Sequence, residues 1–323
     1  MSLNFVITGG AGFIGSAVIK EIRRQFSGVR EIYVVDNLTS GKRSNLRTAG
    51  FVNFIEGTVS GDAWGLLPRK ADFVFHFADI LGTKRVSARP DICAFVAING
   101  VLRAVEYAIR RDARFFYAST SMIYGPGTPV CLEGSPVVFG NHPVWTYSAA
   151  KYIGEMIVRD AVARQGLQAV VGRFFNVIGP NQSPGSDHVV AKFIDAAKAD
   201  RPLEVYSHGT QTRSFTYIDD AAFAAVRLAI MATGKDPDDI IFNIAAGSPG
   251  ISVDDLASLI IKKTGAGSHI NYVPYPLGGR YDDSLSRVPN IDKLKKALGD
   301  EWSPIKTVGE MIDKILEAQK KEV

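Results

Sequence analysis

Short apolar runs alternate with helical patterns along the first half of the chain. Helical spacing with an apolar face is present in Phe13–Phe26, Asp91–Ile109 and Lys151–Arg164. The apolar runs are rich in Val, Ile and Phe and predict buried strands at residues 4–8, 31–36, 51–56, 71–77, 114–119 and 169–174. Strands that alternate with helices predict right-handed βαβ units and a parallel sheet covered on both faces.

The pattern changes after Asn176. Residues 178–188 are rich in Gly, Pro, Asn and Ser and predict a loop. Helical patterns follow at 189–199 and 219–233, a further strand candidate lies at 240–245, and the chain from Ser252 is mostly helical, with a Pro- and Gly-rich insert at 274–279. We therefore expect an α/β fold: a doubly wound parallel sheet of Rossmann type with a smaller, mostly helical C-terminal lobe. The first lobe is predicted to comprise residues 1–176 and about 214–246, and the smaller lobe about 177–213 and 247–323.

Composition narrows the functional classes. Of the 323 residues, 46% are hydrophobic and 22% are charged, which is the balance of an ordinary globular protein. The net charge of +4 is too small to indicate a nucleic-acid partner. Two distant cysteines without a CxxC pair predict neither a metal site nor a disulfide. The N-terminus has no signal-peptide pattern, and the apolar helix candidate Ala221–Thr233 is too short to span a bilayer. We expect a soluble, cytoplasmic protein without a membrane partner.

The first predicted strand runs into a glycine-rich loop, Thr8-Gly9-Gly10-Ala11-Gly12-Phe13-Ile14-Gly15. Glycines at 9, 12 and 15 permit a tight turn, close approach to a pyrophosphate, and close packing of helix on strand. Free N–H groups at the start of the helix then face the phosphates. Asp36 ends the second strand, where a carboxylate binds the adenosine ribose hydroxyls and repels a 2′-phosphate. The loop therefore predicts a dinucleotide and favours NAD, while the nearby Lys42 and Arg43 leave NADP open.

A tyrosine and a lysine lie one helical turn apart in Tyr147-Ser148-Ala149-Ala150-Lys151. This spacing alone is common by chance, and its value comes from its position downstream of the dinucleotide loop. The preceding strand at 114–119 leads into Ser119-Thr120-Ser121. These hydroxyls would lie at the carboxyl end of a parallel strand, where such folds bind their ligands.

Together with other segments, these motifs make the chain resemble the extended short-chain dehydrogenases/reductases. Within that group it resembles the NAD-dependent nucleotide-sugar epimerase/dehydratase family, and most of all UDP-glucose 4-epimerases. The matching segments, in family order, are TGGAGFIG (8–15), DNLTSGKRSNL (36–46), FHFA (75–78), ASTSMIYG (118–125), YSAAK (147–151), RFFNVIGP (173–180) and GTQTRSFTYIDD (209–220). The resemblance implies NAD in the first lobe, a nucleotide sugar (first of all a UDP-sugar) in the smaller lobe, and a homodimer formed through the helices at 91–109 and 151–164.

The resemblance also assigns roles to residues. Tyr147 is the acid/base, Lys151 binds the nicotinamide ribose, and Thr120 shares a hydrogen bond with the sugar hydroxyl that is oxidised. The residues predicted to bind NAD are Gly9, Gly12, Phe13, Ile14, Gly15, Asp36, Asn37, Ser40, Gly41, Thr58, Val59, Phe77, Ala78, Asn99, Ser119, Tyr147 and Lys151. The residues predicted to bind the substrate are Thr120, Ser121, Asn176, Tyr206, Arg213 and Arg280.

Elementary electrostatics supports the acid/base role of Tyr147. A free tyrosine has a pKa of about 10, and lowering it to about 7 needs roughly 4 kcal/mol. A lysine charge about 5–6 Å away contributes roughly 3 kcal/mol at an effective dielectric constant near 20. The positive nicotinamide ring can supply the rest. Lys151 and NAD⁺ together are therefore predicted to make Tyr147 a base near neutral pH.

Two arginines are the candidates for the substrate diphosphate, because the guanidinium fork matches phosphate oxygens. Arg213 and Arg280 lie where the family's diphosphate-binding arginines occur. Asn176 resembles the family asparagine that hydrogen-bonds the diphosphate and the sugar, and Tyr206 lies where the family often flanks the base. A surface role for either arginine and a core role for Tyr206 stay open.

The residues after Thr120 separate the reactions of the family. Related 4,6-dehydratases carry Thr-Asp-Glu there, and related UDP-glucuronate decarboxylases carry a Glu two residues before the Tyr of the YG pair. This chain has Ser121 and Met122, and neither is a carboxylate. We therefore predict 4-epimerisation, in which C4 is oxidised, hydride returns to the other face, and NAD⁺ is regenerated. The alternatives are a dehydratase, decarboxylase or keto-sugar reductase of the same family, or a non-catalytic NAD-binding protein.

Some positions depart from the family pattern. Asp79 follows FHFA where the family usually has a small or neutral residue, so the wall of the cofactor or substrate site is altered. Thr58 and Val59 stand where the family usually has an aspartate near the adenine. Arg287 lies near the position that gates sugar size, and it either contacts an acidic sugar or faces solvent. His76 is predicted to be structural, and the histidines show no metal-ligand spacing.

Overall fold

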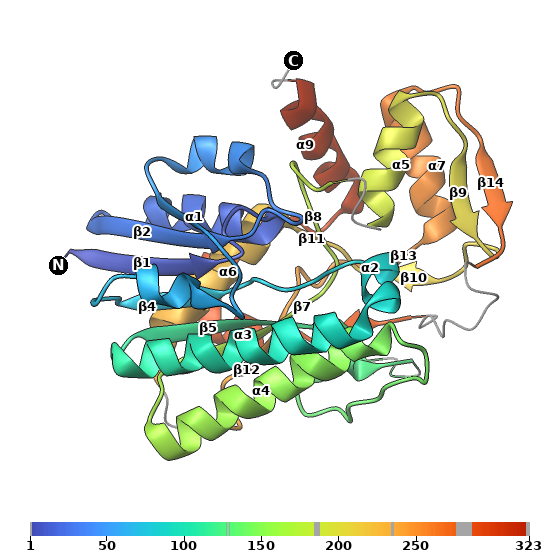
Figure 1. The fold of residues 1–323 in the computed structure, drawn as a ribbon. Coiled ribbons are helices and arrows are strands. Elements are labelled where there is room, and N and C mark those ends of the chain that lie inside the picture. The colour runs from blue at the N-terminus through green and yellow to red at the C-terminus, as the bar shows by residue number, and fades with distance from the viewer. Residues whose placement is uncertain are drawn as a thin grey trace.

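A seven-stranded parallel sheet forms the centre of the protein (Figure 1). The fold is taken from a computed structural model, which describes residues 2–126, 128, 130–183, 188–233, 236–275 and 286–320. The sheet strands are β1 (Leu3–Thr8), β2 (Val29–Asp36), β3 (Asn53–Glu56), β4 (Phe73–His76), β5 (Arg114–Thr120), β7 (Ala169–Phe174) and β12 (Ile241–Ile244). Their order across the sheet is β12-β7-β5-β4-β1-β2-β3. The chain adds β2 and β3 on one side of β1 and then crosses to β4 on the other, and ligands of such sheets bind at the carboxyl ends beside this reversal.

Helices cover both faces of the sheet, as Figure 1 shows. Along one face lie α3 (Pro90–Arg110) and α4 (Trp145–Gln165), and on the other lie α1 (Phe13–Gln25) and α6 (Ile218–Met231). Strand side chains alternate between the two layers. In β1, Val6 joins the cluster under α3 and α4, whereas Phe5 and Ile7 join the cluster under α1 and α6. Because both faces of β1 are buried, its sequence is continuously apolar rather than alternating.

The C-terminal part adds small sheets and helices beyond the carboxyl edge of the main sheet (Figure 1). There α5 (Val189–Lys198) and α7 (Val253–Thr264) pack against the parallel pair of β9 (Leu203–Tyr206) and β14 (Ile270–Val273). The other helices are α2 (Thr83–Ala88), α8 (Asp292–Leu298) and α9 (Val308–Lys320), and short 3-10 helices include η3 (Ser121–Tyr124). The short strands are β6 (Val130–Cys131), β8 (Val177–Ile178), β10 (Thr212–Arg213), β11 (Thr216–Tyr217), β13 (Ile251–Ser252) and β15 (Val288–Pro289).

The longest apolar helix is α3. By length and composition it could cross a membrane, and 44% of its most apolar window is buried inside the protein. Its buried residues include Cys93, Ala97, Val101 and Ala104, so packing on the sheet and on α4 accounts for much of its apolar character. The helix candidate Ala221–Thr233, taken from the sequence as the most apolar one, belongs to α6, which at 14 residues is shorter than α3.

The predicted fold class is confirmed, and the predicted strands and helices of the main sheet are present. One boundary matters for the site: α4 begins at Trp145 rather than at Lys151, so Tyr147 is already helical. The C-terminal region was predicted to be mostly helical, and it also contains β14 and β15. The two-residue strand β15 carries no periodic pattern and could not be predicted, whereas the four-residue strand β14 was missed.

Candidate functional site

The loop between β1 and α1 has the geometry of a phosphate cradle. Gly9 has a φ of +69°, and a Cβ built on it would lie 2.7 Å from the Ala78 backbone nitrogen. A Cβ on Gly12 would lie 3.0 Å from the Gly9 carbonyl oxygen, and one on Gly15 would clash with that oxygen. The N-cap of α1, Gly12, makes no side-chain hydrogen bond to the helix, and no acidic residue occupies the first turn, which contains Phe13 and Ile14. The first N–H groups of α1 therefore remain available to an anion.

Asp36 lies at the end of β2 beside this loop and is 8% exposed. Its carboxylate accepts hydrogen bonds from the backbone N–H groups of Ala11, at 3.0 Å, and Leu38, at 2.8 Å. Burial raises the pKa of Asp36, and the two hydrogen bonds oppose that rise. A Cβ on Gly41 would approach Asp36 Oδ1 to 2.9 Å, so the approach to the carboxylate is narrow. This arrangement fits the hydroxyls of the adenosine ribose and disfavours a phosphate on its 2′ position.

The other residues predicted to bind NAD lie mostly at the carboxyl ends of neighbouring strands. Asn37 and Ser40 are exposed after β2, Thr58 is exposed and Val59 buried after β3, and Phe77 and Ala78 are half-buried after β4. Asn99, on α3, donates a hydrogen bond to the Phe95 carbonyl oxygen at 2.9 Å. A Cβ on the next residue, Gly100, would lie 2.9 Å from Val59 Cγ2, so this part of α3 reaches the same edge of the sheet.

Tyr147 and Lys151 lie in the first turns of α4, beside the end of β5. The half-buried Tyr147 is hydrogen-bonded through its side chain to Thr120, the last residue of β5. Lys151 Nζ donates a hydrogen bond to the Ala118 carbonyl oxygen at 2.8 Å and lies 6.0 Å from the centre of the Tyr147 ring. The three residues predicted to act in catalysis are therefore neighbours, and the lysine distance is close to that used in the sequence argument.

Asp79, expected from the sequence to alter the wall of the site, contacts Lys151, which the sequence did not predict. Its Oδ2 atom lies 3.0 Å from Lys151 Nζ, and the two side chains are only 2% and 4% exposed. Burial, followed by the Asp79 charge, raises the pKa of Tyr147 above its usual value, and the hydrogen bond with Thr120 opposes this rise. The pKa of Tyr147 therefore depends on Asp79 as well as on the lysine and the cofactor. The available signal was the departure of Asp79 from the small residue of the family pattern.

His76 and Cys93 line the same region as neutral groups. Burial, with a smaller contribution from the Lys151 charge, lowers the pKa of His76 to about 3. Its Nδ1 atom is hydrogen-bonded to the Thr8 hydroxyl at 2.8 Å, as expected for a structural histidine. Burial and the nearby Asp79 raise the pKa of the Cys93 thiol to about 12. Within the described residues, no group of His, Cys, Asp or Glu side chains could hold a metal ion.

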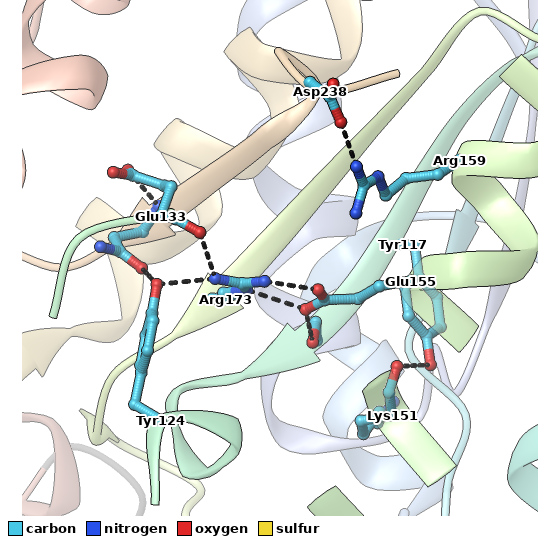
Figure 2. A network of polar contacts seen from close by, with 10 residues as sticks. Tyr117, Tyr124, Glu133, Lys151, Glu155, Arg159, Arg173 and Asp238 are labelled. Atoms are coloured by element: carbon cyan, nitrogen blue, oxygen red, sulfur yellow. Dashed lines mark hydrogen bonds and ion pairs between the residues drawn. The ribbon is translucent and has the colours of Figure 1, made fainter. Parts of the chain in front are cut away.

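A second buried ion pair lies one turn further along α4 (Figure 2). Glu155 accepts two hydrogen bonds from Arg173 of β7, at 2.9 and 2.7 Å, and a third from the Ser119 hydroxyl. Arg173 also donates to the Tyr124 hydroxyl at 2.9 Å and to the Glu133 carbonyl oxygen at 2.8 Å. Ser119, predicted to contact NAD, is therefore engaged in this network, which the sequence argument did not predict.

The predicted substrate residues are only partly assembled in the described structure. Asn176 follows β7 and donates to the Ser214 carbonyl oxygen at 3.0 Å, which brings it next to Arg213 in β10. Ser121 is buried at the start of η3. Tyr206 ends β9, and its ring lies 5.5 Å from that of Tyr275. Arg280 falls outside the described residues.

Comparisons with known proteins place these features in context. Residues 5–245 match the NAD dependent epimerase/dehydratase family. A UDP-N-acetyl-alpha-D-glucosaminuronate decarboxylase of Bacillus cytotoxicus is 32% identical over 305 residues, which cover 92% of each chain. The UDP-glucose 4-epimerase of Thermotoga maritima, solved with UDP-glucose, is 28% identical with a TM-score of 0.85, and 99% of both chains is covered. The UDP-glucose 4-epimerase of Thermus thermophilus, solved with NAD, shares the fold at 24% identity and a TM-score of 0.84, covering 99% of this chain and 100% of the other.

Proposed function

Because the chain belongs to the NAD-dependent epimerase/dehydratase family, we propose that it epimerises a nucleotide sugar, first of all a UDP-sugar, at C4. The protein is an enzyme that modifies nucleotide sugars, and its cofactor is NAD. One observation carries the specific reaction. Thr120, Tyr147 and Lys151 gather at the carboxyl edge of the sheet, while Ser121 and Met122 occupy the turn where elimination would need carboxylates.

The site residues divide the proton chemistry among them. Tyr147 accepts the proton of the C4 hydroxyl and returns it after the sugar has turned. Thr120, hydrogen-bonded to Tyr147, is placed to hold the same sugar oxygen. Lys151 contributes a positive charge beside the phenol. NAD, held by the loop between β1 and α1, by Asp36 and by Lys151, would supply the hydride chemistry at C4 of the sugar.

The diphosphate must stay bound while the sugar ring turns. We place it against Asn176 and Arg213, because the Asn176 side chain is hydrogen-bonded to Ser214, the residue that follows Arg213. The guanidinium supplies a planar set of donors for phosphate oxygens. Arg280, the second predicted arginine, lies outside the described residues.

Decarboxylation of a nucleotide uronic acid is the second candidate, and the similarity to the Bacillus cytotoxicus decarboxylase favours it. Oxidation at C4 of a uronic acid places a ketone β to the C6 carboxylate. Loss of CO₂ then leaves the electron pair of the broken C–C bond in an enolate, which takes up a proton at C5. Return of the hydride to C4 would convert the resulting ketone into the pentose and restore NAD⁺. This route uses the same Tyr147 and Lys151, but Met122 stands where the related decarboxylases carry a glutamate, and for that reason epimerisation is proposed first.

A panel of UDP-, dTDP-, GDP- and CDP-sugars, including uronic acids, tests both candidates. The protein is incubated with each sugar without added reduced cofactor, and the C4 epimer and CO₂ are measured. We expect the C4 epimer without net reduction of NAD. Release of CO₂ with a pentose product from a uronic acid would replace the proposal by the second candidate, and conversion of no sugar would refute both.

A tyrosine variant tests the base. In Tyr147→Phe, turnover should fall by about 10²–10⁴-fold, because the group that moves the proton is gone. Tyr272→Phe is the matched control, since Tyr272 is 54% exposed and lies on β14. Full turnover in Tyr147→Phe would remove the proposed base.

We also propose that the protein is a homodimer paired through α3 and α4. Phe95 and Leu102 on α3 and Ile153 and Met156 on α4 are exposed large apolar side chains, so these two helices present an apolar surface to solvent. Exposed apolar surface of this kind is typical of interfaces. Light scattering should give twice the chain mass, and Met156→Glu should shift the protein towards the monomer. A monomeric mass for the unmodified chain would refute the proposal.

A further inference from the structure

Asp79 places a buried negative charge beside the acid/base pair. Its Oδ1 atom accepts a hydrogen bond from the Ile80 backbone nitrogen at 2.7 Å, which fixes the orientation of the carboxylate. Its Oδ2 atom faces Lys151 Nζ at 3.0 Å and makes no hydrogen bond within the described part of the chain. Lys151 is held from the other side by the Ala118 carbonyl oxygen at 2.8 Å. The lysine charge is therefore divided between two acceptors before any ligand reaches it.

The titratable groups around this pair come from four elements. Near neutral pH, His76 at the end of β4 and Cys93 on α3 are uncharged, because burial lowers the pKa of the first to about 3 and raises that of the second to about 12. Burial also raises the pKa of Tyr117 on β5 well above its usual value. On α4, Glu155 is bound by Arg173. Among these groups, Asp79 is the charge that raises the pKa of Tyr147, and Lys151 is its ion-pair partner.

A lysine with a carboxylate in contact acts on its surroundings as a dipole rather than as a single charge. The stabilisation that an ammonium gives to a phenolate falls steeply when an opposite charge stands beside it. The side-chain positions support this description, because Lys151 Nζ lies 6.0 Å from the centre of the Tyr147 ring but 3.0 Å from Asp79. The family usually has a small or neutral residue at this position, which brings no such countercharge.

We propose that Asp79 is a positioning residue that neutralises and orients the Lys151 ammonium, so that Tyr147 gives up its proton only at higher pH than lysine alone would allow. The proposal rests on the acid/base role proposed for Tyr147. It predicts an enzyme whose turnover rises towards alkaline pH. It also predicts that removal of the Asp79 charge extends activity to lower pH.

The ionisation of Tyr147 can be measured without a sugar substrate. Tyrosinate absorbance is titrated in the NAD⁺-loaded protein, and the signal of Tyr147 is isolated from the 11 tyrosines by subtracting a matched Tyr147→Phe titration. In Asp79→Asn, which keeps the shape and removes the charge, Tyr147 should ionise at least about one pH unit lower than in the unmodified protein. An unchanged titration, or no Tyr147 signal in either protein, would overturn the proposal.

Two further variants separate charge from structure. Asp79→Glu keeps the charge, so Tyr147 should ionise in this variant close to the pH at which it ionises in the unmodified protein. A purely structural role of Asp79 predicts the same Tyr147 titration in Asp79→Asn and Asp79→Glu. Asp91→Asn is the matched control, because its carboxylate is exposed and bound to Arg89 at the start of α3. Because no sugar is present, a shift in Asp79→Asn together with a failed sugar panel would uphold the proposal on Asp79 and count against the proposed reaction alone.

Discussion

Two buried ion pairs stand one helical turn apart on α4, and they are built differently. In the pair of Glu155 and Arg173, the carboxylate accepts two hydrogen bonds from the guanidinium and one from Ser119, and the side chains are 0% and 3% exposed. In the pair of Asp79 and Lys151, the two charges meet through a single contact of 3.0 Å, and the carboxylate oxygen that makes it has no hydrogen bond within the described residues. Burial alone therefore does not separate a structural pair from a functional one.

The difference lies in what each pair leaves available. A bidentate arginine pair satisfies its donors and fixes the strands and helix that carry it, here β7 and α4. A lysine presents three rotatable donors, and Lys151 uses one on Ala118, while its contact with Asp79 is an ion pair without a hydrogen bond among the described residues. The pair of Glu155 and Arg173 is suited to join β7 to α4. The pair of Asp79 and Lys151 is suited to set the pH at which Tyr147 ionises.

The largest effect is expected when the cation of the pair formed by Asp79 and Lys151 is removed. In Lys151→Met, turnover of the sugar identified by the panel should fall by about 10²–10⁴-fold, because both the ribose contact and the charge beside Tyr147 are lost. Affinity for NAD⁺, measured by fluorescence titration, should fall as well. Lys198→Met, at an exposed lysine on α5, is the control. Turnover within threefold of the unmodified enzyme would show that Lys151 has no such role.

Much of this site could be predicted from sequence because its signals are local. The glycine loop lies between an apolar run and a helical pattern, Asp36 ends the next strand, and Tyr147 and Lys151 are one turn apart. Each of these depends on a short segment whose conformation the pattern itself fixes. The parallel sheet follows from the alternation of strands and helices, and it brings the carboxyl ends of those strands to one edge.

What the sequence could not predict depends on contacts between distant segments. Asp79 was recognised as a departure, but its contact with Lys151 depends on how the loop after β4 turns towards α4. The connection of Arg173 to Tyr124, and of Tyr124 to Asn243 on β12, likewise joins segments far apart in the chain. None of these three contacts is indicated by a periodic pattern or a motif in the sequence. The electrostatics of Tyr147 therefore could not be worked out from the lysine alone.

The second test compares stability when each pair loses its carboxylate. Glu155→Gln should lower the free energy of unfolding by about 3 kcal/mol, because it leaves the Arg173 charge buried and poorly paired. Asp79→Asn should cost less than Glu155→Gln, since it removes one ion-pair contact and the hydrogen bond from Lys151 to Ala118 remains. Both are measured by urea denaturation at neutral pH.

The exposed pair of Arg110 and Glu106 supplies the reference for this second test. Glu106→Gln should change the free energy of unfolding by less than about 0.5 kcal/mol, because solvent screens that pair. Equal losses in Glu155→Gln and Asp79→Asn would contradict the distinction between a structural and a functional pair.

The mildest test uses a third carboxylate, Asp220 of α6, whose hydrogen bond comes from a backbone amide. Asp220 is half-buried, and its Oδ2 atom accepts a hydrogen bond from the Ile305 nitrogen at 2.9 Å. Burial raises the pKa of Asp220 to about 6, against the opposing effect of that hydrogen bond. Because the folded pKa lies above the unfolded value, the protonated form stabilises the fold at low pH, and this contribution is lost as pH rises through about 6.

Asp220→Asn should therefore increase the free energy of unfolding by about 1 kcal/mol at pH about 8 and leave it nearly unchanged at pH about 4. The gain is limited because Asp220 is partly solvated and lies in the first turn of α6, where a negative charge is favourable. Asp300→Asn, at an exposed position after α8, should show no such pH dependence. A loss of stability in Asp220→Asn at the higher pH would mean that the hydrogen bond from the Ile305 backbone amide offsets the cost of burying the Asp220 charge. Arg173 offsets the corresponding cost for Glu155. In that case the number of hydrogen bonds, rather than the presence of a cation, would distinguish the structural carboxylates of this protein.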